Sequence, residues 1–129
     1  MADRAPRILL VDDEPPIQTL LSFPLERDGY EVVAAHNGIE ALALAEQHEP
    51  TVAVLDVGMP GLDGIEVLTA IRAAESLAHT RVLLLTAKAQ ESDVRRGYDA
   101  GADAYVKKPF SPAELATRVR ELYEAAGAL

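Results

Sequence analysis

In the stretch ILLVDDE at residues 8–14, a continuous apolar run of four residues stops at three acidic residues. A short apolar run without alternation is typical of a strand buried on both faces of a parallel sheet. Comparable runs follow at 31–35, 52–55 and 82–85, and a weaker one lies at 104–106. Segments with the apolar spacing of helices come between and after these runs. This alternation predicts an α/β fold in which five helices cover both faces of a mainly parallel, five-stranded sheet.

Capping residues mark the ends of several predicted helices. Ser111 and Pro112 suit the N-cap and the first position of the last helix. Gly29 and Gly101 stand where helices end in a left-handed residue. Pro24 lies inside the first helical segment. Because proline removes a backbone hydrogen bond and clashes with the preceding turn, we expect a kink or an early break near residues 22–23. Apolar residues with helical spacing occur at 17–25, 42–46, 65–71, 94–102 and 115–122.

Composition and charge exclude several classes of protein. The chain has 129 residues, no cysteine and a formal net charge of −9, so disulfide scaffolds, thiolate metal sites and cysteine nucleophiles are excluded. Nucleic-acid binding needs clustered lysine and arginine side chains, so we do not expect so acidic a chain to bind nucleic acid directly. No apolar run approaches the roughly 18 residues of a membrane helix, and the first residues, MADRAPR, lack the apolar stretch of a signal peptide. We expect one cytoplasmic domain over residues 1–129, with its core at about 6–124 and no effector domain.

Chemically active side chains follow four of the predicted strands. Because the carboxyl ends of parallel strands meet at one edge of a sheet, we expect these side chains to lie together. Carboxylate oxygens are ligands that Mg²⁺ prefers, and a carboxylate beside such a cation can act as a nucleophile toward phosphorus. A hydroxyl and an ammonium group would then stabilise the oxygens of the transferring phosphoryl group. The residues are Asp12 and Asp13 after the first strand, Asp56 after the third, Thr86 after the fourth and Lys108 after the fifth.

Each of these residues alone also has a purely structural explanation. The acidic pair at 12–13 could cap the following helix, whose dipole favours negative charge there. Asp56 could be a turn residue, Thr86 could pack at a strand end, and Lys108 could be a solvated surface lysine. Suitable residue types at four strand ends are harder to explain in this way, so we favour a shared site.

Four stretches of the chain resemble the receiver domains of two-component response regulators. They are ILLVDDEPPI, VLDVGMPGLDGIEVL, VLLLTAKA and GADAYVKKPFSPAEL, and with their spacing the resemblance covers about residues 6–124. It implies a doubly wound sheet with the flavodoxin-like strand order 2-1-3-4-5. The last stretch is most similar to receivers attached to winged-helix DNA-binding domains, the OmpR/PhoB-like group.

The resemblance also implies roles for the acidic residues. Asp56 matches the phosphoacceptor. Asp12 and Asp13 match the acidic pair that binds Mg²⁺ together with Asp56, and Asp13 is the more direct ligand of the pair. Mn²⁺ could substitute for Mg²⁺ at this site. The backbone carbonyl of Gly58 matches a further protein ligand to the metal.

Three further positions match residues that contact the phosphoryl group or respond to it. Lys108 matches the lysine that pairs with this group, and the following Pro109 is expected in cis. Thr86 matches the hydroxyl residue that moves to the phosphoryl group. Tyr105 matches the aromatic side chain that turns inward when Thr86 moves.

The function that the resemblance implies is a phosphorylation switch. A sensor histidine kinase would transfer a phosphoryl group to Asp56, adding roughly −2 of charge. The receiver would catalyse only its own phosphorylation and dephosphorylation, so we expect a signalling protein rather than an enzyme. The surface built by the fourth helix, fifth strand and fifth helix would change and control a protein partner or an attached effector domain.

The chain departs from the family pattern at several positions. Gly58 and Lys88 flank the path of an attacking water or phosphodonor, and we expect them to tune the rate of dephosphorylation. Ala104 replaces a commonly acidic residue, so the usual charge network of a phosphorylation-dependent homodimer is incomplete. The charged residues expected on that dimer face are Asp103, Glu114, Arg118 and Arg120.

Two other functions fit these residues less well. A receiver-like interaction module that no longer uses phosphate would be expected to have lost Asp56, the acidic pair or Lys108, and all are present. A metal-dependent aspartyl-phosphate phosphatase would need a second aspartate two residues after the nucleophile as general acid, and position 58 is glycine.

Overall fold

The structure of the protein is a computed structural model that describes most of the 129-residue chain. Three predicted residues, Lys88, Lys108 and Pro109, lie outside the described residues. For residues 91–94 and 126–127 only the backbone is described, which leaves the side chain of Val94 out. The described ranges are 6–58, 63–86, 91–107 and 110–127.

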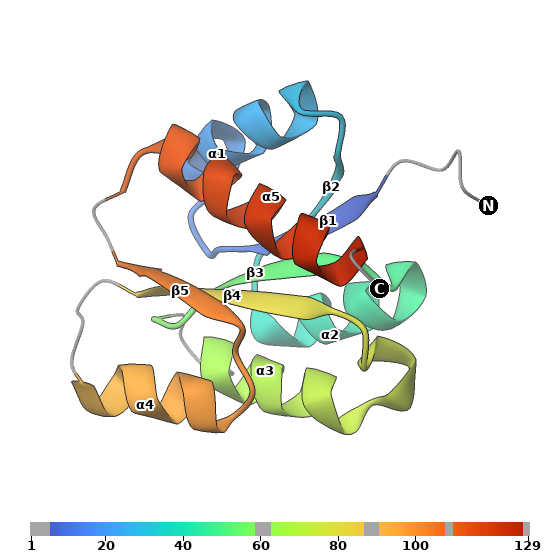
Figure 1. The fold of residues 1–129 in the computed structure, drawn as a ribbon, viewed down its shortest axis with the longest axis vertical. Coiled ribbons are helices and arrows are strands. Elements are labelled where there is room, and N and C mark those ends of the chain that lie inside the picture. Colours follow the sequence, from blue (N-terminus) through green and yellow to red (C-terminus); the bar gives the residue numbers. More distant parts are fainter. Residues whose placement is uncertain (1–5, 59–62, 87–90, 108–109, 128–129) are drawn as a thin grey trace.

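Strands and α-helices alternate along the described chain, as predicted (Figure 1). A short 3₁₀ helix, Glu75–Leu77, follows the third α-helix. The strands are β1 (Arg7–Val11), β2 (Glu31–Ala35), β3 (Val52–Asp56), β4 (Arg81–Thr86) and β5 (Ala104–Lys107). The helices are α1 (Pro15–Arg27), α2 (Gly38–His48), α3 (Gly64–Ala73), α4 (Glu91–Asp99) and α5 (Pro112–Gly127).

The five strands form one sheet in the order β2-β1-β3-β4-β5, and every neighbouring pair is parallel. This confirms the predicted class and strand order. One detail of the prediction is wrong for β2: Glu31 and Ala34 are exposed, because β2 is an edge strand with a neighbour on one side only. β3 and β4 also run further than their apolar cores, and Asp56 and Thr86 are their last residues.

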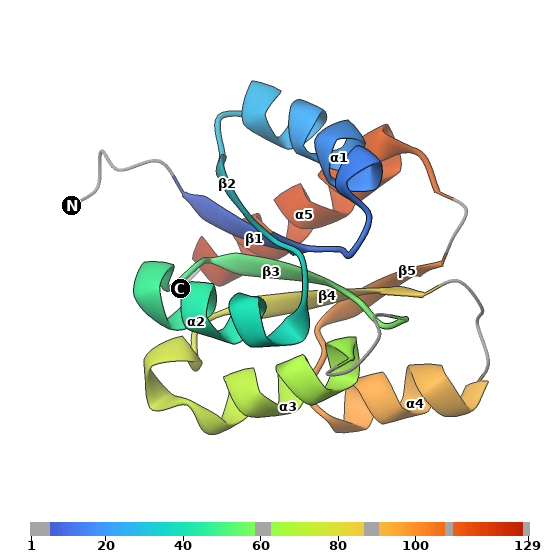
Figure 2. The same ribbon diagram turned by 180° about the vertical axis from the view of Figure 1, so that it is seen from behind.

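Alternate strand residues enter two separate cores. Leu9 and Val11 pack in the core that contains residues of α2 and α3. Ile8 and Leu10 pack in the core that contains residues of α1 and α5. Figures 1 and 2 show α1 and α5 on one side of the sheet and α2, α3 and α4 on the other. A slip of one residue would exchange these two sets of side chains, so the burial of both faces fixes the register.

The predicted capping residues are confirmed. The Ser111 Oγ accepts the Glu114 N–H at 3.0 Å, and α5 begins at Pro112. Gly29 and Gly101 have φ values of 99° and 108°, the left-handed conformation that ends α1 and α4.

The break predicted at Pro24 is wrong, because α1 continues through the proline to Arg27. Leu21 and Leu25, on either side of Pro24, are 2% and 0% exposed in the core beneath the helix. Burial of two leucines contributes about 3–6 kcal/mol, which exceeds the roughly 3 kcal/mol that an interior proline costs. Tertiary packing therefore holds the helix intact.

Candidate functional site

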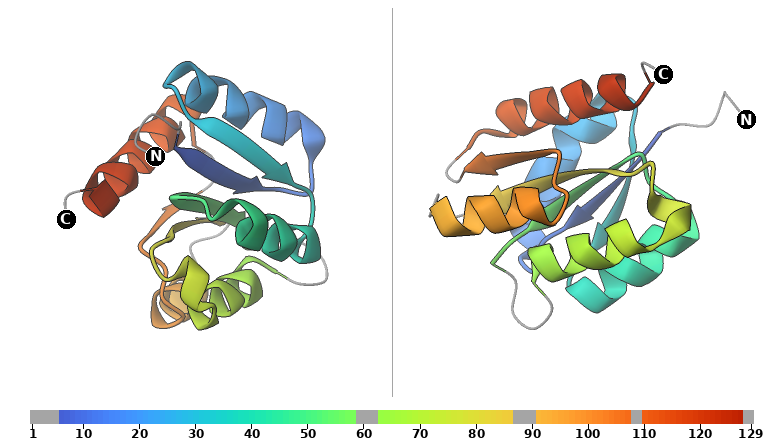
Figure 3. Two further views of the ribbon diagram at one scale, coloured as in Figure 1. Left: turned by 90° about the vertical axis from the view of Figure 1, so that its right-hand side faces the viewer. Right: turned by 60° about the horizontal axis from the view of Figure 1, so that its bottom comes forward.

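The carboxyl edge of the sheet gathers the predicted side chains from three adjacent strands. Asp12 directly follows β1, Asp56 ends β3 and Thr86 ends β4. The parallel register pairs Asp56 with Leu85, one residue before Thr86. In the left view of Figure 3 the arrowheads of β1 and β2 lie beside the first turn of α1, so the acidic turn at 12–14 sits at this edge.

Three carboxylates meet at this edge. One oxygen from each of Asp12, Asp13 and Asp56 lies within 4.8 Å of the other two. Asp12 and Asp56 are buried, whereas Asp13 is exposed. Like charges this close repel one another, and a hard divalent cation with oxygen ligands, such as Mg²⁺, would offset the repulsion. The donor set therefore fits the predicted metal.

Backbone hydrogen bonds outside α1 hold Asp12. Its N–H donates to the Ala35 carbonyl at the end of β2 (3.1 Å), and its Oδ1 accepts the Glu14 N–H (2.9 Å). Helix α1 begins with Pro15 and Pro16, which have no N–H for a side chain to cap. Asp12 is therefore held by the end of β2 and by its own turn, and α1 has no side-chain cap at its N-cap residue.

Asp56 makes a local turn contact as well as belonging to the acidic cluster. Its Oδ1 accepts the Gly58 N–H at 2.9 Å, the contact expected of an aspartate in a turn. This hydrogen bond fixes the orientation of the carboxylate. A Cβ atom at Gly58 would lie 3.6 Å from the same oxygen, in ordinary contact. Any side chain at position 58 would therefore begin against the Asp56 carboxylate.

Gly64 is a site residue that sequence reasoning missed. It is the first residue of α3, and a Cβ atom there would lie 2.6 Å from the Asp56 carbonyl oxygen. Only a glycine lets α3 begin so close to the end of β3. A local signal was available, because Asp63 and Glu66 form a capping box around Gly64.

The predicted switch residues lie on neighbouring strands. Thr86 is 6% exposed and is paired in register with Lys107, the residue before Lys108. Tyr105 is half-buried on β5. Its ring packs edge-on against Tyr98 of α4, with the ring centroids 5.6 Å apart.

Comparison with known proteins assigns the family. The family model described as the response regulator receiver domain matches residues 8–120. The chain belongs to this family. The receiver domain is 48% identical over 116 residues to the alkaline phosphatase synthesis transcriptional regulatory protein PhoP of Bacillus subtilis, covering 90% of this chain and 48% of the relative. It is 45% identical over 117 residues to the DNA-binding dual master transcriptional regulator RpaA of Synechocystis, covering 91% and 48%. The chain thus spans about half the length of these relatives.

Solved receiver structures share the fold. A CheY-like receiver domain protein from Methanospirillum hungatei matches with a TM-score of 0.90 and 30% identity, covering 97% of this chain and 98% of the other. The chemotaxis protein CheY4 of Vibrio cholerae matches with a TM-score of 0.87 and 33% identity, covering 92% and 99%. The predicted resemblance to receivers is confirmed. In the described part of the receiver domain, no helix has the length and apolar character to span a membrane.

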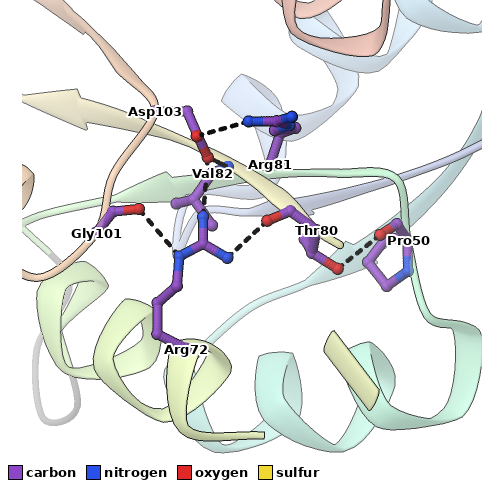
Figure 4. Close-up of polar contacts among 7 residues, drawn as sticks. All are labelled: Pro50, Arg72, Thr80, Arg81, Val82, Gly101 and Asp103. Atoms are coloured by element: carbon purple, nitrogen blue, oxygen red, sulfur yellow. Dashed lines mark hydrogen bonds and ion pairs between the residues drawn. The ribbon is translucent and has the colours of Figure 1, made fainter. Parts of the chain in front are cut away.

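Asp103, predicted on a dimer face, is bonded within the receiver domain (Figure 4). It precedes β5 at the amino edge of the sheet. Its Oδ2 accepts the Arg72 guanidinium and the Val82 N–H, both at 2.8 Å, and its Oδ1 lies 3.3 Å from the Arg81 guanidinium. The Asp103 carboxylate is therefore committed to contacts inside one chain.

Arg72 is the centre of this cluster. From the last turn of α3 it also donates to the Thr80 carbonyl (2.7 Å) and to the Gly101 carbonyl (3.0 Å). It thereby joins α3 to the start of β4 and to the turn after α4. Sequence reasoning missed Arg72, since its partners lie 8 to 31 residues away along the chain.

The other three residues of the predicted dimer face lie on α5. Glu114 and Arg120 are exposed. The guanidinium of Arg118 donates to the Tyr105 carbonyl at 3.4 Å and lies 3.5 Å from Glu121. In the described ranges no ion pair joins Asp103 to these three residues.

Two ionisable groups elsewhere have shifted pKa values. The backbone N–H and ring of His36 hydrogen-bond to Glu40 at the start of α2 and lower the pKa of that carboxyl. Burial, followed by the charge of Asp28, raises the pKa of the Tyr30 phenol. The Tyr30 ring packs edge-on against Tyr123 of α5.

Proposed function

We propose that the receiver domain is a phosphorylation switch in which Asp56 accepts a phosphoryl group from the phosphohistidine of a sensor histidine kinase. The observation that carries this proposal is the convergence of Asp12, Asp13 and Asp56 within 4.8 Å at one sheet edge. The Asp56 carboxylate is buried and oriented by a backbone N–H. This arrangement suits a nucleophile that works at a metal site.

The transfer step needs one attacking oxygen and a leaving imidazole. A carboxylate oxygen of Asp56 attacks phosphorus, the P–N bond breaks, and the imidazole nitrogen keeps the electron pair of that bond and takes up a proton. Asp12, Asp13, Asp56 and the Gly58 carbonyl would hold Mg²⁺, or Mn²⁺ in its place. When bound, this cation supplies positive charge that offsets the carboxylates and the phosphoryl oxygens.

Thr86 and Lys108 would contact the phosphoryl group. The Thr86 hydroxyl, at the last residue of β4, donates to a phosphoryl oxygen, and Lys108 supplies an ammonium group. Movement of Thr86 leaves room for Tyr105 on the neighbouring strand to turn inward. Since Tyr105 packs on Tyr98 of α4, that motion would change the face formed by α4, β5 and α5.

Intact mass measurement tests the reaction. The wild-type protein with Mg²⁺ and acetyl phosphate should gain one phosphoryl group, and Asp56→Asn or a chelator should abolish the gain. If no adduct forms, binding of a beryllium fluoride mimic distinguishes a short-lived acyl phosphate from an inert site. Absence of both the adduct and mimic binding would favour a phosphate-independent interaction module.

Positions 58 and 88 would set the lifetime of the acyl phosphate. A side chain at 58 would begin 3.6 Å from Asp56 Oδ1 and so would lie in the path of an attacking water. Lys88, outside the described residues, would add a mobile cation to the same path. The lifetimes of phosphorylated Gly58→Asn and Lys88→Ala proteins test this, and unchanged lifetimes in both would contradict it.

The output would pass through the α4–β5–α5 face to an effector domain or a protein partner. Both curated relatives are named as transcriptional regulators, and one as DNA-binding. A phosphorylation-dependent homodimer would use Glu114, Arg118 and Arg120 on α5, whereas Asp103 would first have to leave Arg72. Light scattering with and without beryllium fluoride, on wild type and Arg118→Ala, tests whether this face dimerises.

A further inference from the structure

Gln18 is a buried polar side chain that the proposed mechanism leaves without a role. The buried polar residues of the described chain are few. Asp12, Asp56 and Thr86 belong to the proposed site, and Thr80 bonds to the Pro50 carbonyl at the other edge of the sheet. Gln18, the fourth residue of α1, is 5% exposed.

The Gln18 side chain meets Asp12 at one shared acceptor. Its Nε2 donates to the Ala35 carbonyl, which also accepts the Asp12 N–H at 3.1 Å. Ala35 is fully buried at the end of β2. One carbonyl therefore joins three elements: the end of β2, the start of the acidic turn and α1.

The backbone of the first turn of α1 does not bond to β2, so the Gln18 side chain supplies the hydrogen bond between them. Pro15 and Pro16 have no N–H, and the N–H groups of Ile17 and Gln18 both donate to the Glu14 carbonyl. These backbone groups hold the helix together and do not reach β2. The Gln18 amide ties the helix to the strand, so the turn between β1 and α1 is held at both ends.

We propose that Gln18 is a positioning residue of the metal site. It fixes the turn at 12–14 so that the carboxylates of Asp12 and Asp13 converge with Asp56. This inference rests on the proposed function, because it assumes that the three carboxylates bind a divalent cation.

The experiment measures Mg²⁺ affinity separately from chemistry. Gln18→Met keeps the length of the side chain and removes the donor, and Gln18→Asn keeps the amide but shortens its reach. Gln47→Met, at an exposed position of α2, is the matched control. Calorimetric titration of Mg²⁺ gives the Kd, and amide hydrogen exchange reports on the Asp12 N–H.

Both Gln18 variants should bind Mg²⁺ about tenfold more weakly, at the lower end of what loss of an outer-shell hydrogen bond costs. Exchange of the Asp12 N–H should become faster, and the Mg²⁺ concentration that gives half-maximal phosphorylation by acetyl phosphate should rise by about the same factor as the Kd. Gln47→Met should match wild type in all three measurements.

Unchanged Kd and unchanged Asp12 exchange in folded Gln18 variants would overturn the inference and leave Gln18 as a packing residue. A wild-type protein that neither binds Mg²⁺ nor accepts a phosphoryl group would instead overturn the proposed function, and with it the metal-site role. In that case, faster exchange of the Asp12 N–H in the variants would still support the contact between Gln18 and Asp12 through the Ala35 carbonyl, and unchanged exchange would contradict it. If Gln18→Met does not fold, Gln18→Asn alone decides between these outcomes.

Discussion

Substitution of Gly64 by alanine tests how α3 is placed against the end of β3. The added Cβ would lie 2.6 Å from the Asp56 carbonyl oxygen and 2.9 Å from its carbonyl carbon, whereas ordinary contact begins at 3.4 Å. Both contacted atoms belong to the backbone of a central strand. The start of α3 must therefore move, or β3 must distort next to Asp56.

The size of the effect follows from this contact. Overpacking of this kind costs about 1–3 kcal/mol, and replacing glycine in a helix returns at most about 1 kcal/mol of helix propensity. We expect a net loss of about 1–2 kcal/mol in the free energy of unfolding. Gly97→Ala is a matched control, because its Cβ would also lie 2.6 Å from a neighbour, but that neighbour is the Cδ1 at the end of the Leu84 side chain, which can rotate away more easily than backbone. Its free energy of unfolding should change by less than about 1 kcal/mol, because the gain of about 1 kcal/mol in helix propensity inside α4 offsets most of a small overpacking cost.

Urea denaturation followed by circular dichroism measures both changes as shifts in midpoint at a constant slope. Gly64→Ala should also be phosphorylated more slowly, because the displaced backbone carries Asp56. The reasoning is refuted if Gly64→Ala is as stable as wild type, or if Gly97→Ala loses as much stability as Gly64→Ala.

Three further predictions concern charge. Arg72→Met should lower the free energy of unfolding by about 2–3 kcal/mol, because Asp103 loses the nearer of its two guanidinium partners and two carbonyls lose their charged donor, while Arg118→Met on the surface of α5 should change it by less than about 1 kcal/mol in thermal unfolding. Mg²⁺ at ten times its Kd should stabilise the wild type by about 1.4 kcal/mol, and Asp13→Asn should lose most of this gain in calorimetry; an equal gain in both proteins would place the ion elsewhere. The pKa of the Tyr30 phenol is higher in the folded chain than its ordinary value of 10.0. The contribution of Tyr30 to folding stability is therefore complete below about pH 10 and is lost as pH rises through the folded pKa. In denaturant titrations, Tyr30→Phe should lose less stability above pH 10 than the wild type.

Much of the fold follows from local sequence patterns. The parallel strands were predictable because their apolar runs are continuous, and the caps at Ser111, Gly29 and Gly101 were predictable because each depends on residues within one turn. Pro24 was misjudged because local propensity alone does not show that Leu21 and Leu25 anchor the helix on both sides.

The acidic cluster was predictable because strand ends in a parallel sheet share one edge. The supporting contacts were not, since each joins residues that are distant in sequence. Gln18 reaches a carbonyl 17 residues away, and Arg72 reaches a carboxylate 31 residues away. The resemblance to receivers covered the residues of the chemistry and did not extend to these supports.

The Arg72 cluster lies at the amino edge of the sheet and the acidic cluster at its carboxyl edge, so residues that support the fold are separated from residues of the proposed site. The six residues of β4 place roughly 17–20 Å between those edges, and at that distance two unit charges interact by about 1 kcal/mol or less at an effective dielectric constant of about 20. Substitutions at the amino edge can therefore adjust folding stability with only a small change in the field at Asp56. A reserve of stability there would let the carboxyl edge accumulate substitutions that are costly to stability, and would in this way make the receiver domain more tolerant of mutation.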